Sequence, residues 1–443
     1  MSQNTLFIAE NPCEKAAADQ LTIGLDDLIL TQDMPTSAGS KMLAEFKSLF
    51  AARVDERLRE AGHHIAGKVN IGEFGFDFLG ETSYFGPVVD ADENLTTAAS
   101  KLLADSAVDA IVGLDVNGTQ ARAAALSGQV HLKPTYGCVS RFGTIAVACS
   151  GETVDITARS TDAVQQVLDV LAGHDDSDGT SLPAAECARI TSNGLAEGVA
   201  AGGAFASPIT RVKVARGLMD TADADTKQLV EKAISALSAQ GVTVSDTAPE
   251  TDELFAVGNL AWNILMCAEL CNNVNRFEGM KYGYHTQKYT TIGELYTKSR
   301  TEAFGALTKT AILYGSEVLA TDNYDRCYDK ALRIRRLISE TFAKEFANEV
   351  AGETSGQTSG QTALLLPACA KRSYGLADVE ANPYLAFEEN RFTAPAAITG
   401  LPALTAGGVQ LVGPAFSDAV MLKLVGTVFS AAGSPADCAG KEA

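Results

Sequence analysis

Hydrophobic and polar positions follow two different periods along this chain, one typical of helices and one of strands. Residues 43–62 carry an apolar stripe at helical spacing and end in Gly62, so we predict a helix there. We expect two further helices, over 161–172 with Thr161 as N-cap and over 226–240. The segments 64–70, 110–112 and 242–246 predict strands. This alternation predicts an α/β fold, in which a large mixed sheet lies between helices.

The second half of the chain has a different pattern. Residues 252–350 are largely helical in period and hold most of the aromatic and basic residues, so we interpret them as a helical insertion. Residues 352–362 (GETSGQTSGQT) predict a flexible low-complexity loop, and 363–367 (ALLLP) a buried strand. Glycine and proline punctuate 399–414, as in closely spaced strands that return to a core. We expect residues 1–443 to form a single domain.

Composition narrows the classes of function. The net charge of −20 argues against direct binding of nucleic acid and against docking on anionic lipid, and 46% apolar residues exclude a disordered chain. No basic and apolar leader opens the sequence and no uninterrupted apolar run reaches the length of a membrane span, so we expect no membrane association. Nine thinly spread cysteines favour a reducing compartment, and we expect a cytoplasmic protein.

Several local motifs fail when their full pattern is checked. Residues 62–69 (GHHIAGKV) resemble a phosphate-binding loop, but Val69 replaces the hydroxyl residue and the segment leads into a strand. Asp175, Asp176 and Asp178 lack the glutamate that closes a calcium loop. Cys267 and Cys271 share a helical face without a second ligand pair, which favours buried thiols. We therefore predict neither a metal nor a cofactor.

One stretch changes the interpretation. Residues 132–181, which begin LKPTYGCVSRFGTIAVACSGE, resemble the amidase-signature family and are most similar to the A subunits of the aspartyl/glutamyl-tRNA amidotransferases. Further similar strings follow the family's order along nearly the whole chain: SKML (40–43), GKVNIGEF (67–74), SYFGP (83–87), AELCNNVNRFEGMKYGY (268–284), FTAPAAITGLPAL (392–404) and QLVGPAF (410–416). The resemblance implies one amidase-signature fold, with helices on both sides of a mixed sheet.

The resemblance also implies a mechanism whose parts can be checked here. The family uses a serine nucleophile, a second serine that relays its proton and a buried lysine that accepts it. The family string that holds the lysine falls on 21–29, where the lysine position is occupied by Asp26, or by Leu25 if the register is shifted by one residue. Neither side chain can replace the lysine as a base. The glycine- and serine-rich string that holds the second serine falls on 94–108, where the double serine is deleted and only Ser100 stands near the edge.

The nucleophile string departs from the family as well. Counting back from KPTYG places Asp115 on the family's aspartate and Gly118 on its second glycine. Asn117 replaces the first glycine, and Thr119 stands in place of the nucleophilic serine. The acidic residue that helps to hold the amino group of glutamine is replaced by Asn390. These positions, Asp26, Asp115, Asn117, Gly118, Thr119 and Asn390, are the candidate catalytic and pocket residues.

Three hypotheses follow. In the leading one, the chain is a catalytically degenerate binding or scaffold protein that partners amidotransferase-like subunits or a second copy of itself. In the second, it is an active amidase that uses Thr119 as nucleophile and Asp26 as base, with Asp26 and Asp115 in one pocket. In the third, the old pocket senses a small amide or an amino acid. A polar pocket with Thr119 and Asp26 about 3–4 Å apart favours the enzyme, and a filled or apolar pocket favours the scaffold.

Overall fold

A mixed β-sheet runs through the molecule, which we describe from a computed structural model for residues 5–11, 20–347 and 360–431. Parallel pairing joins β2 to β3 and β6, and β9 to β10 and β11, whereas the other neighbours are antiparallel. In sheet order the strands are β1 (Phe7–Glu10), β3 (His64–Val69), β2 (Thr22–Asp26), β6 (Ala110–Asp115), β8 (Thr153–Ala158), β7 (Val130–Lys133), β12 (Ala403–Ala406), β13 (Val409–Val412), β11 (Gln361–Pro367), β9 (Ile209–Val214) and β10 (Thr243–Asp246). A separate small ribbon pairs β4 (Val88–Val89) with β5 (Leu95–Thr96).

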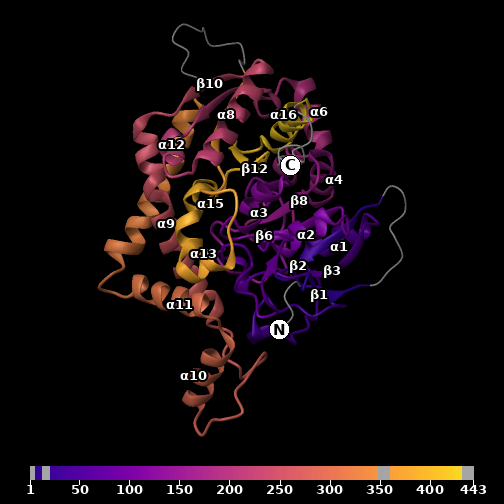
Figure 1. Cartoon of the computed structure of the whole chain (residues 1–443). Coiled ribbons are helices and arrows are strands. Elements are labelled where there is room, and N and C mark those ends of the chain that lie inside the picture. The colour runs from indigo at the N-terminus through magenta and orange to yellow at the C-terminus, as the bar shows by residue number, and fades with distance from the viewer. Residues whose placement is uncertain (1–4, 12–19, 348–359, 432–443) are drawn as a thin grey trace.

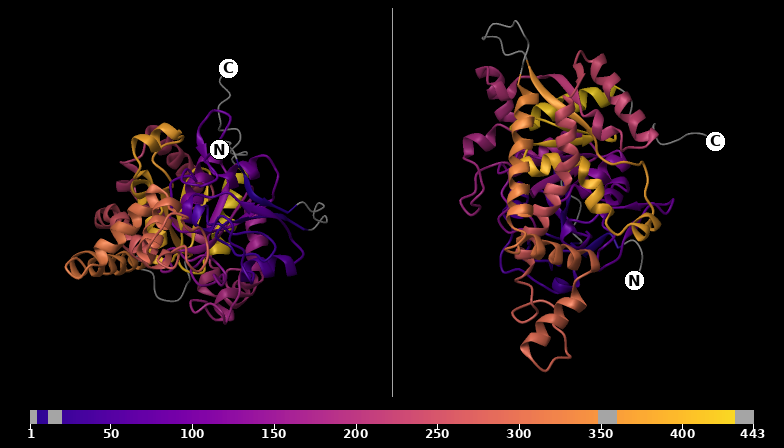
Figure 2. Two further views of the ribbon diagram at one scale, coloured as in Figure 1. Left: turned by 90° about the horizontal axis from the view of Figure 1, so that it is seen from below. Right: turned by 90° about the vertical axis from the view of Figure 1, so that its left-hand side faces the viewer.

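Helices cover both sides of this sheet, as the resemblance implied (Figure 1, Figure 2). They are α1 (Arg53–Glu60), α2 (Ala98–Ala104), α3 (Thr119–Ser127), α4 (Thr161–Leu171), α5 (Ala184–Ala188), α6 (Ser192–Ala201), α7 (Arg216–Met219), α8 (Ala224–Ala239), α9 (Pro249–Val274), α10 (Ile292–Ala303), α11 (Ala306–Leu319), α12 (Lys330–Phe346), α13 (Leu376–Ala381), α14 (Leu385–Glu389), α15 (Ala394–Thr399) and α16 (Asp418–Ala431). Short 3₁₀ turns η1 (Lys41–Leu43), η2 (Glu73–Gly75), η3 (Ala204–Ala206) and η5 (Asn390–Phe392) and a π-helical turn η4 (Asp325–Asp329) complete the described part.

Most of the predicted elements are confirmed. The strands β3, β6 and β10, the helices α4 and α8 and the hairpin of β12 and β13 lie where the sequence pattern placed them. The N-cap of α4 is Ser160 rather than Thr161, since the hydroxyl of Ser160 accepts from Ala163 N. Most of the predicted loop 352–362 lies outside the described residues, and its last two residues already belong to β11.

The predicted helix over 43–62 is wrong in its first half. Helix α1 begins only at Arg53, because the preceding residues are committed to tertiary contacts. The carbonyl of Phe46 accepts from Thr36 N at 2.9 Å, and the hydroxyl of Ser48 bonds within its own turn to Phe50. The apolar stripe therefore marks buried side chains but not a continuous helix.

The described part of the segment predicted over 252–350 is helical, and its helices form a layer in which α11, α12 and α15 pack against α9 (Figure 1, Figure 2). Helix α10 and the chain leading into it project beyond this layer. By length and composition alone α9 could cross a membrane, but 61% of its most apolar window is buried inside the protein. Its hydrophobicity therefore has a sufficient cause in the core.

Candidate functional site

Two neighbouring strands bring the candidate residues together at one edge of the sheet. Because β2 and β6 are parallel, their last residues, Asp26 and Asp115, lie at the same edge. Both side chains line a cavity of about 20 Å³, which also touches Thr119. The other lining residues are Asn70, Ile71, Gly72, Gly75, Asp77, Gly80, Thr97, Leu114 and Gln120. Asp26, Asp115 and Thr119 thus line one cavity, as the enzyme hypothesis requires.

Asp115 fixes the turn between β6 and α3. Its Oδ1 accepts from Gly118 N at 2.6 Å, and its Oδ2 forms an ion pair with Lys133 Nζ at 3.1 Å. Lys133 also donates to the carbonyl of Gly151 at 2.9 Å. Although burial opposes ionisation, Lys133, His131 and the backbone bond together hold the pKa of Asp115 below its ordinary value. Asp115 is therefore an ionised anchor, and sequence reasoning had not identified Lys133 as its partner.

Thr119, at the start of α3, has its hydroxyl group already engaged. Thr119 Oγ1 donates to the carbonyl oxygen of Asp77 at 2.7 Å. The fully buried guanidinium of Arg122 donates to Thr119 Oγ1 at 3.4 Å and to the carbonyls of Asp77, Phe78 and Asn117. Arg122 thus ties the first turn of α3 to the chain around Asp77.

Asn117 and Asn390 meet in a second buried cluster beside the cavity. Asn390 Nδ2 donates to Asn117 Oδ1 at 2.8 Å and to Asn263 Oδ1 at 2.6 Å. Trp262 Nε1 also donates to Asn117 Oδ1, at 3.3 Å. Neither Asn117 nor Asn390 lines the 20 Å³ cavity. Their amides bond to one another, so they stabilise the packing of α9 and η5 against the α3 turn.

Gly118 lets the chain pass close to η5. It has a φ of +77°, and a Cβ built on it would lie 2.3 Å from Thr393 Oγ1. A left-handed residue in so tight a space has to be glycine. This explains why Gly118 is retained while the preceding position, Asn117, can carry a side chain.

A row of polar side chains crosses the sheet behind the cavity. Gly113 pairs with Asp155 of β8, and a Cβ on Gly113 would lie 2.4 Å from Asp26 Oδ2 and 2.6 Å from Asp155 Oδ1. The missing side chain therefore allows the two carboxyl groups to approach each other. Asp155 Oδ2 lies 2.9 Å from His131 Nε2, and the histidine tautomer decides whether Nε2 donates or accepts in this hydrogen bond. Burial first, and then the charge of Asp155, raises the pKa of Asp26 well above its ordinary value.

Sequence reasoning missed Asp155 and His131. A signal for them did exist, because Thr153, Asp155 and Thr157 alternate in a strand whose every residue is buried. Polar side chains at every second position of a buried strand indicate a shared polar row. After burial, Asp155 is the first charged group that raises the pKa of Asp26.

Ser100 does not reach the cavity. It lies in the first turn of α2 and its N–H donates to the N-cap hydroxyl of Thr97 at 3.1 Å, while Gln129 Nε2 donates to its carbonyl at 2.7 Å. Thr97, not Ser100, lines the cavity. The segment where the resemblance places the second serine is therefore a capped helix in this protein.

Lys68, in the stretch that resembled a phosphate loop, is a fully buried amine. Its Nζ donates to the carbonyl of Ile29 and approaches the carbonyl of Asp26 at 3.5 Å. Burial lowers the pKa of Lys68 to about 8, against the opposing charges of Asp27, Asp55 and Asp26. It lies outside the lining of the cavity, on β3.

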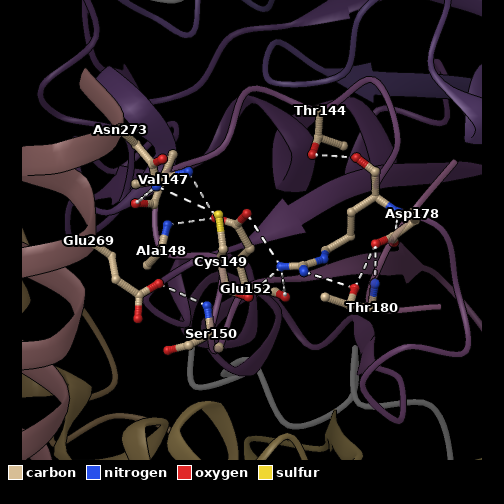
Figure 3. Close-up of polar contacts among 12 residues, drawn as sticks. Thr144, Val147, Ala148, Cys149, Ser150, Glu152, Asp178, Thr180, Glu269 and Asn273 are labelled. Carbon is tan, nitrogen blue, oxygen red and sulfur yellow. Dashed lines mark hydrogen bonds and ion pairs between the residues drawn. The ribbon is translucent and has the colours of Figure 1, made fainter. Parts of the chain in front are cut away.

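The loop that receives Lys133 is itself firmly held. Figure 3 shows Glu152 accepting from the N–H groups of Val147 and Ala148, and Glu269 accepting from Ser150 N. Asn273 of α9 donates to the carbonyl of Val147 at 3.0 Å. Because α9 supplies both Glu269 and Asn273, the helical layer positions the loop that in turn holds Lys133 and Asp115.

The acidic, cysteine and basic segments that do not belong to the pocket have structural roles. Asp175 accepts from Ser140 Oγ at 2.6 Å and pairs with Arg53 at 3.2 Å. Cys267 and Cys271 are buried free thiols of α9. The basic run 326–336 forms ion pairs along its own helix, such as Arg333–Asp329 at 2.7 Å.

Comparison with known proteins first defines the class of fold. The structure matches the crystal structure of the A subunit of the glutamyl-tRNA(Gln) amidotransferase of Thermotoga maritima with a TM-score of 0.72 at 22% identity, over 94% of this chain and 85% of that one. It matches a 6-aminohexanoate cyclic dimer hydrolase with a TM-score of 0.71 at 18% identity, over 94% and 86%. The chain therefore has the same fold as these proteins, a large mixed sheet covered by helices.

Sequence comparison then identifies the family. The Amidase family model matches residues 14–422. The A subunit of the glutamyl-tRNA(Gln) amidotransferase of Halobacterium salinarum is 33% identical over 97% of this chain and 100% of its own length, and that of Coxiella burnetii is 33% identical over 93% and 84%. The chain belongs to the amidase family, and the resemblance seen in its sequence is confirmed.

Proposed function

We propose that this protein is a catalytically degenerate member of the amidase family with a binding or scaffold role in a larger assembly. The observation that carries the proposal is the state of the pocket. Its volume is about 20 Å³, whereas ligand sites for small organic molecules usually enclose about 300–1,000 Å³. The pocket has room for about one water molecule but not for an amide substrate.

The chemistry of the lining residues supports the same proposal. A hydroxyl nucleophile needs a base within about 3 Å. Thr119 instead donates to a backbone carbonyl, which is not a base, and accepts from Arg122, which withdraws electron density from the oxygen. The pocket is polar and contains both Asp26 and Thr119, as the enzyme hypothesis requires, but no hydrogen bond joins them within the described residues.

Lys68 does not supply the missing base. Its lowered pKa resembles that of a catalytic amine, yet its Nζ is directed at the carbonyls of Ile29 and Asp26. It does not touch the cavity that contains Thr119. A proton from Thr119 has no direct path to it in this arrangement.

The helical layer supports a role in binding another protein chain. Residues 252–347 contain 12 Lys and Arg against 12 Asp and Glu, so the layer is neutral on a chain with a net charge of −20. It also exposes large apolar side chains, including Leu260 at 60%, Leu313 at 71% and Leu337 at 51%. Because the opposite charges of the layer cancel, it does not repel an acidic partner as the rest of this chain would, and exposed apolar side chains are available for the core of an interface. The relatives are named as subunits, and we propose that the partner is an amidotransferase-like subunit.

The test is a glutaminase assay on the purified chain and on the native assembly isolated from its source. We expect no hydrolysis of glutamine above that of Thr119→Ala, with other subunits identified in the assembly by mass spectrometry. Hydrolysis that disappears in Thr119→Ala would establish the active-enzyme alternative instead.

A matched pair of surface variants tests the interface. Leu313→Lys should release the partner, while Leu49→Lys, at a residue 92% exposed outside the helical layer, should not. If the partner is retained by both variants, the helical layer is not the interface. Recovery of a homo-oligomer alone would replace the amidotransferase-like partner by a second copy.

A further inference from the structure

Asp26 differs from the other two carboxylates that line the cavity. Asp77 accepts from Gly80 N through Oδ1 and from Thr82 through Oδ2, and both oxygens of Asp115 are bonded. Among the described residues, Asp26 Oδ2 receives only a long bond from Leu114 N at 3.4 Å, and its Oδ1 has no partner. Asp26 is 3% exposed, so this oxygen is a buried acceptor at the wall of a polar cavity.

The cations nearby are committed elsewhere. Lys133 pairs with Asp115, and Lys68 donates to backbone carbonyls of Ile29 and Asp26. The charged groups that face the Asp26 carboxyl are Asp27 of the following turn, Asp155 of β8 and Lys68 of β3. Lys68 is the one cation among these three groups, and its ammonium bonds to backbone carbonyls rather than to the carboxylate of Asp26. A buried carboxylate with no cation bonded to it is costly by several kcal/mol, and a positive particle beside it lowers that cost.

We propose that this cavity binds one monovalent cation about the size of a water molecule, such as ammonium, potassium or rubidium, at Asp26 Oδ1. Asp77 and Asp115, the other two carboxylates of the lining, are already bonded within the protein, so Asp26 alone is left to balance one positive charge. Thr119 and Gln120 also line the cavity, and their side-chain oxygens are held in place by bonds to the Asp77 carbonyl and to Thr97 Oγ1. Within the described residues no group of three His, Cys, Asp or Glu side chains is arranged for a polyvalent metal.

A proton is the competing occupant. Because burial raises the pKa of Asp26, an empty site holds a proton to higher pH than an exposed aspartate does, and cation binding displaces that proton. Cation binding should therefore strengthen as the pH rises. The inference uses the pocket of the proposed function but does not depend on inactivity toward amides, since binding is measured without any substrate.

The experiment compares thermal unfolding of the full chain in rubidium, potassium, ammonium, sodium and tetramethylammonium chloride at equal ionic strength. Tetramethylammonium is too large for the cavity. We expect a saturable rise of the unfolding temperature of about 2–4 °C with the small cations at pH 8.5, and a smaller one at pH 6. The ranking of the four small ions identifies the one that fits.

Asp26→Asn should abolish the rise, whereas Asp418→Asn should keep it, because Asp418 is an equally buried aspartate bonded to Thr135. Crystals of the unmodified protein grown in rubidium chloride provide a measurement that needs no variant. An anomalous peak beside Asp26 supports the site. Equal unfolding temperatures in rubidium and tetramethylammonium, or no peak in the cavity, would show that the proton alone balances Asp26.

Discussion

The ion pair between Asp115 and Lys133 offers the sharpest test of how the site is held together. In Asp115→Asn the shape of the side chain is kept, and the amide oxygen can still accept from Gly118 N. What is lost is the charge that balances Lys133, whose side chain is 3% exposed and whose partner is 4% exposed. Lys133 is then left buried with only the carbonyls of Gly151 and Asp115 as acceptors.

The expected cost is large because both partners are out of water. Removing one member of a buried ion pair typically costs about 3–5 kcal/mol. The matched control is Asp105→Asn, which breaks an exposed pair with Lys101 at a similar distance of 3.1 Å and should cost about 0.5 kcal/mol or less. Asp115→Asn combined with Lys133→Met removes both charges, so the double variant should recover at least about 1 kcal/mol relative to the single one.

The chain contains a single tryptophan that reports on this site. Trp262 is buried and donates to Asn117, two residues from Asp115. Denaturant unfolding followed by tryptophan fluorescence, and in parallel by circular dichroism, therefore compares the local site with the whole fold. The reasoning is refuted if Asp115→Asn unfolds within about 1 kcal/mol of the unmodified protein, or if the double variant is no more stable than the single one.

Three further predictions concern the same framework. Gly118→Ala should lower the free energy of unfolding by at least about 2 kcal/mol in chemical denaturation, because it adds a clash with Thr393 to a left-handed backbone. The control Gly202→Ala is also left-handed but has open space around it, so it should cost about 1 kcal/mol, and equal losses would contradict the close approach at Gly118. Hydrogen bonds from Ser140, Ser177 and Arg53 lower the pKa of Asp175 to about 2, against the effect of burial. Asp175 should therefore contribute about 2 kcal/mol of stability above pH 3.8, which is lost as the pH falls from 3.8 to 2, and Asp175→Asn should flatten the plot of stability against pH in that range. Burial lowers the pKa of Lys68 from 10.5 to about 8, so between pH 8 and 10.5 the unfolded chain binds more protons than the folded protein. The unmodified protein should therefore gain stability relative to Lys68→Met as the pH rises through this range. A stability difference that does not change with pH would show that the amine is not desolvated.

The fold could be predicted because the strings shared with the family are short, continuous stretches of sequence. A strand such as β3 or β6 and a helix such as α4 are specified by the period of their own apolar residues. The candidate positions Asp26, Asp115 and Thr119 could also be found, since the spacing to neighbouring family strings is fixed along the chain. Their convergence on one cavity follows from the parallel pairing of β2 and β6.

The hydrogen-bond partners of these residues could not be predicted in the same way. Strand order brings Asp155 close to Asp26 across Gly113 and joins His131 to Asp155, and Asn263 reaches Asn390 across 127 residues of sequence. The failure of the helix over 43–52 has the same origin, because the contact of Phe46 with Thr36 outweighs local propensity. Each of these contacts joins segments whose relative position exists only after the sheet and helices have assembled.

The sequence by itself therefore determined which residues stand at the pocket and which chemical groups they carry: a carboxylate at 26, a hydroxyl at 119 and amides at 117 and 390. Only the tertiary structure decided what those groups can do. Packing reduced the pocket to about 20 Å³, directed the Thr119 hydroxyl to a backbone carbonyl and left one oxygen of Asp26 unpaired. The physical reason is that residue identity is written along the chain, whereas desolvation and hydrogen bonding depend on which distant groups are buried together.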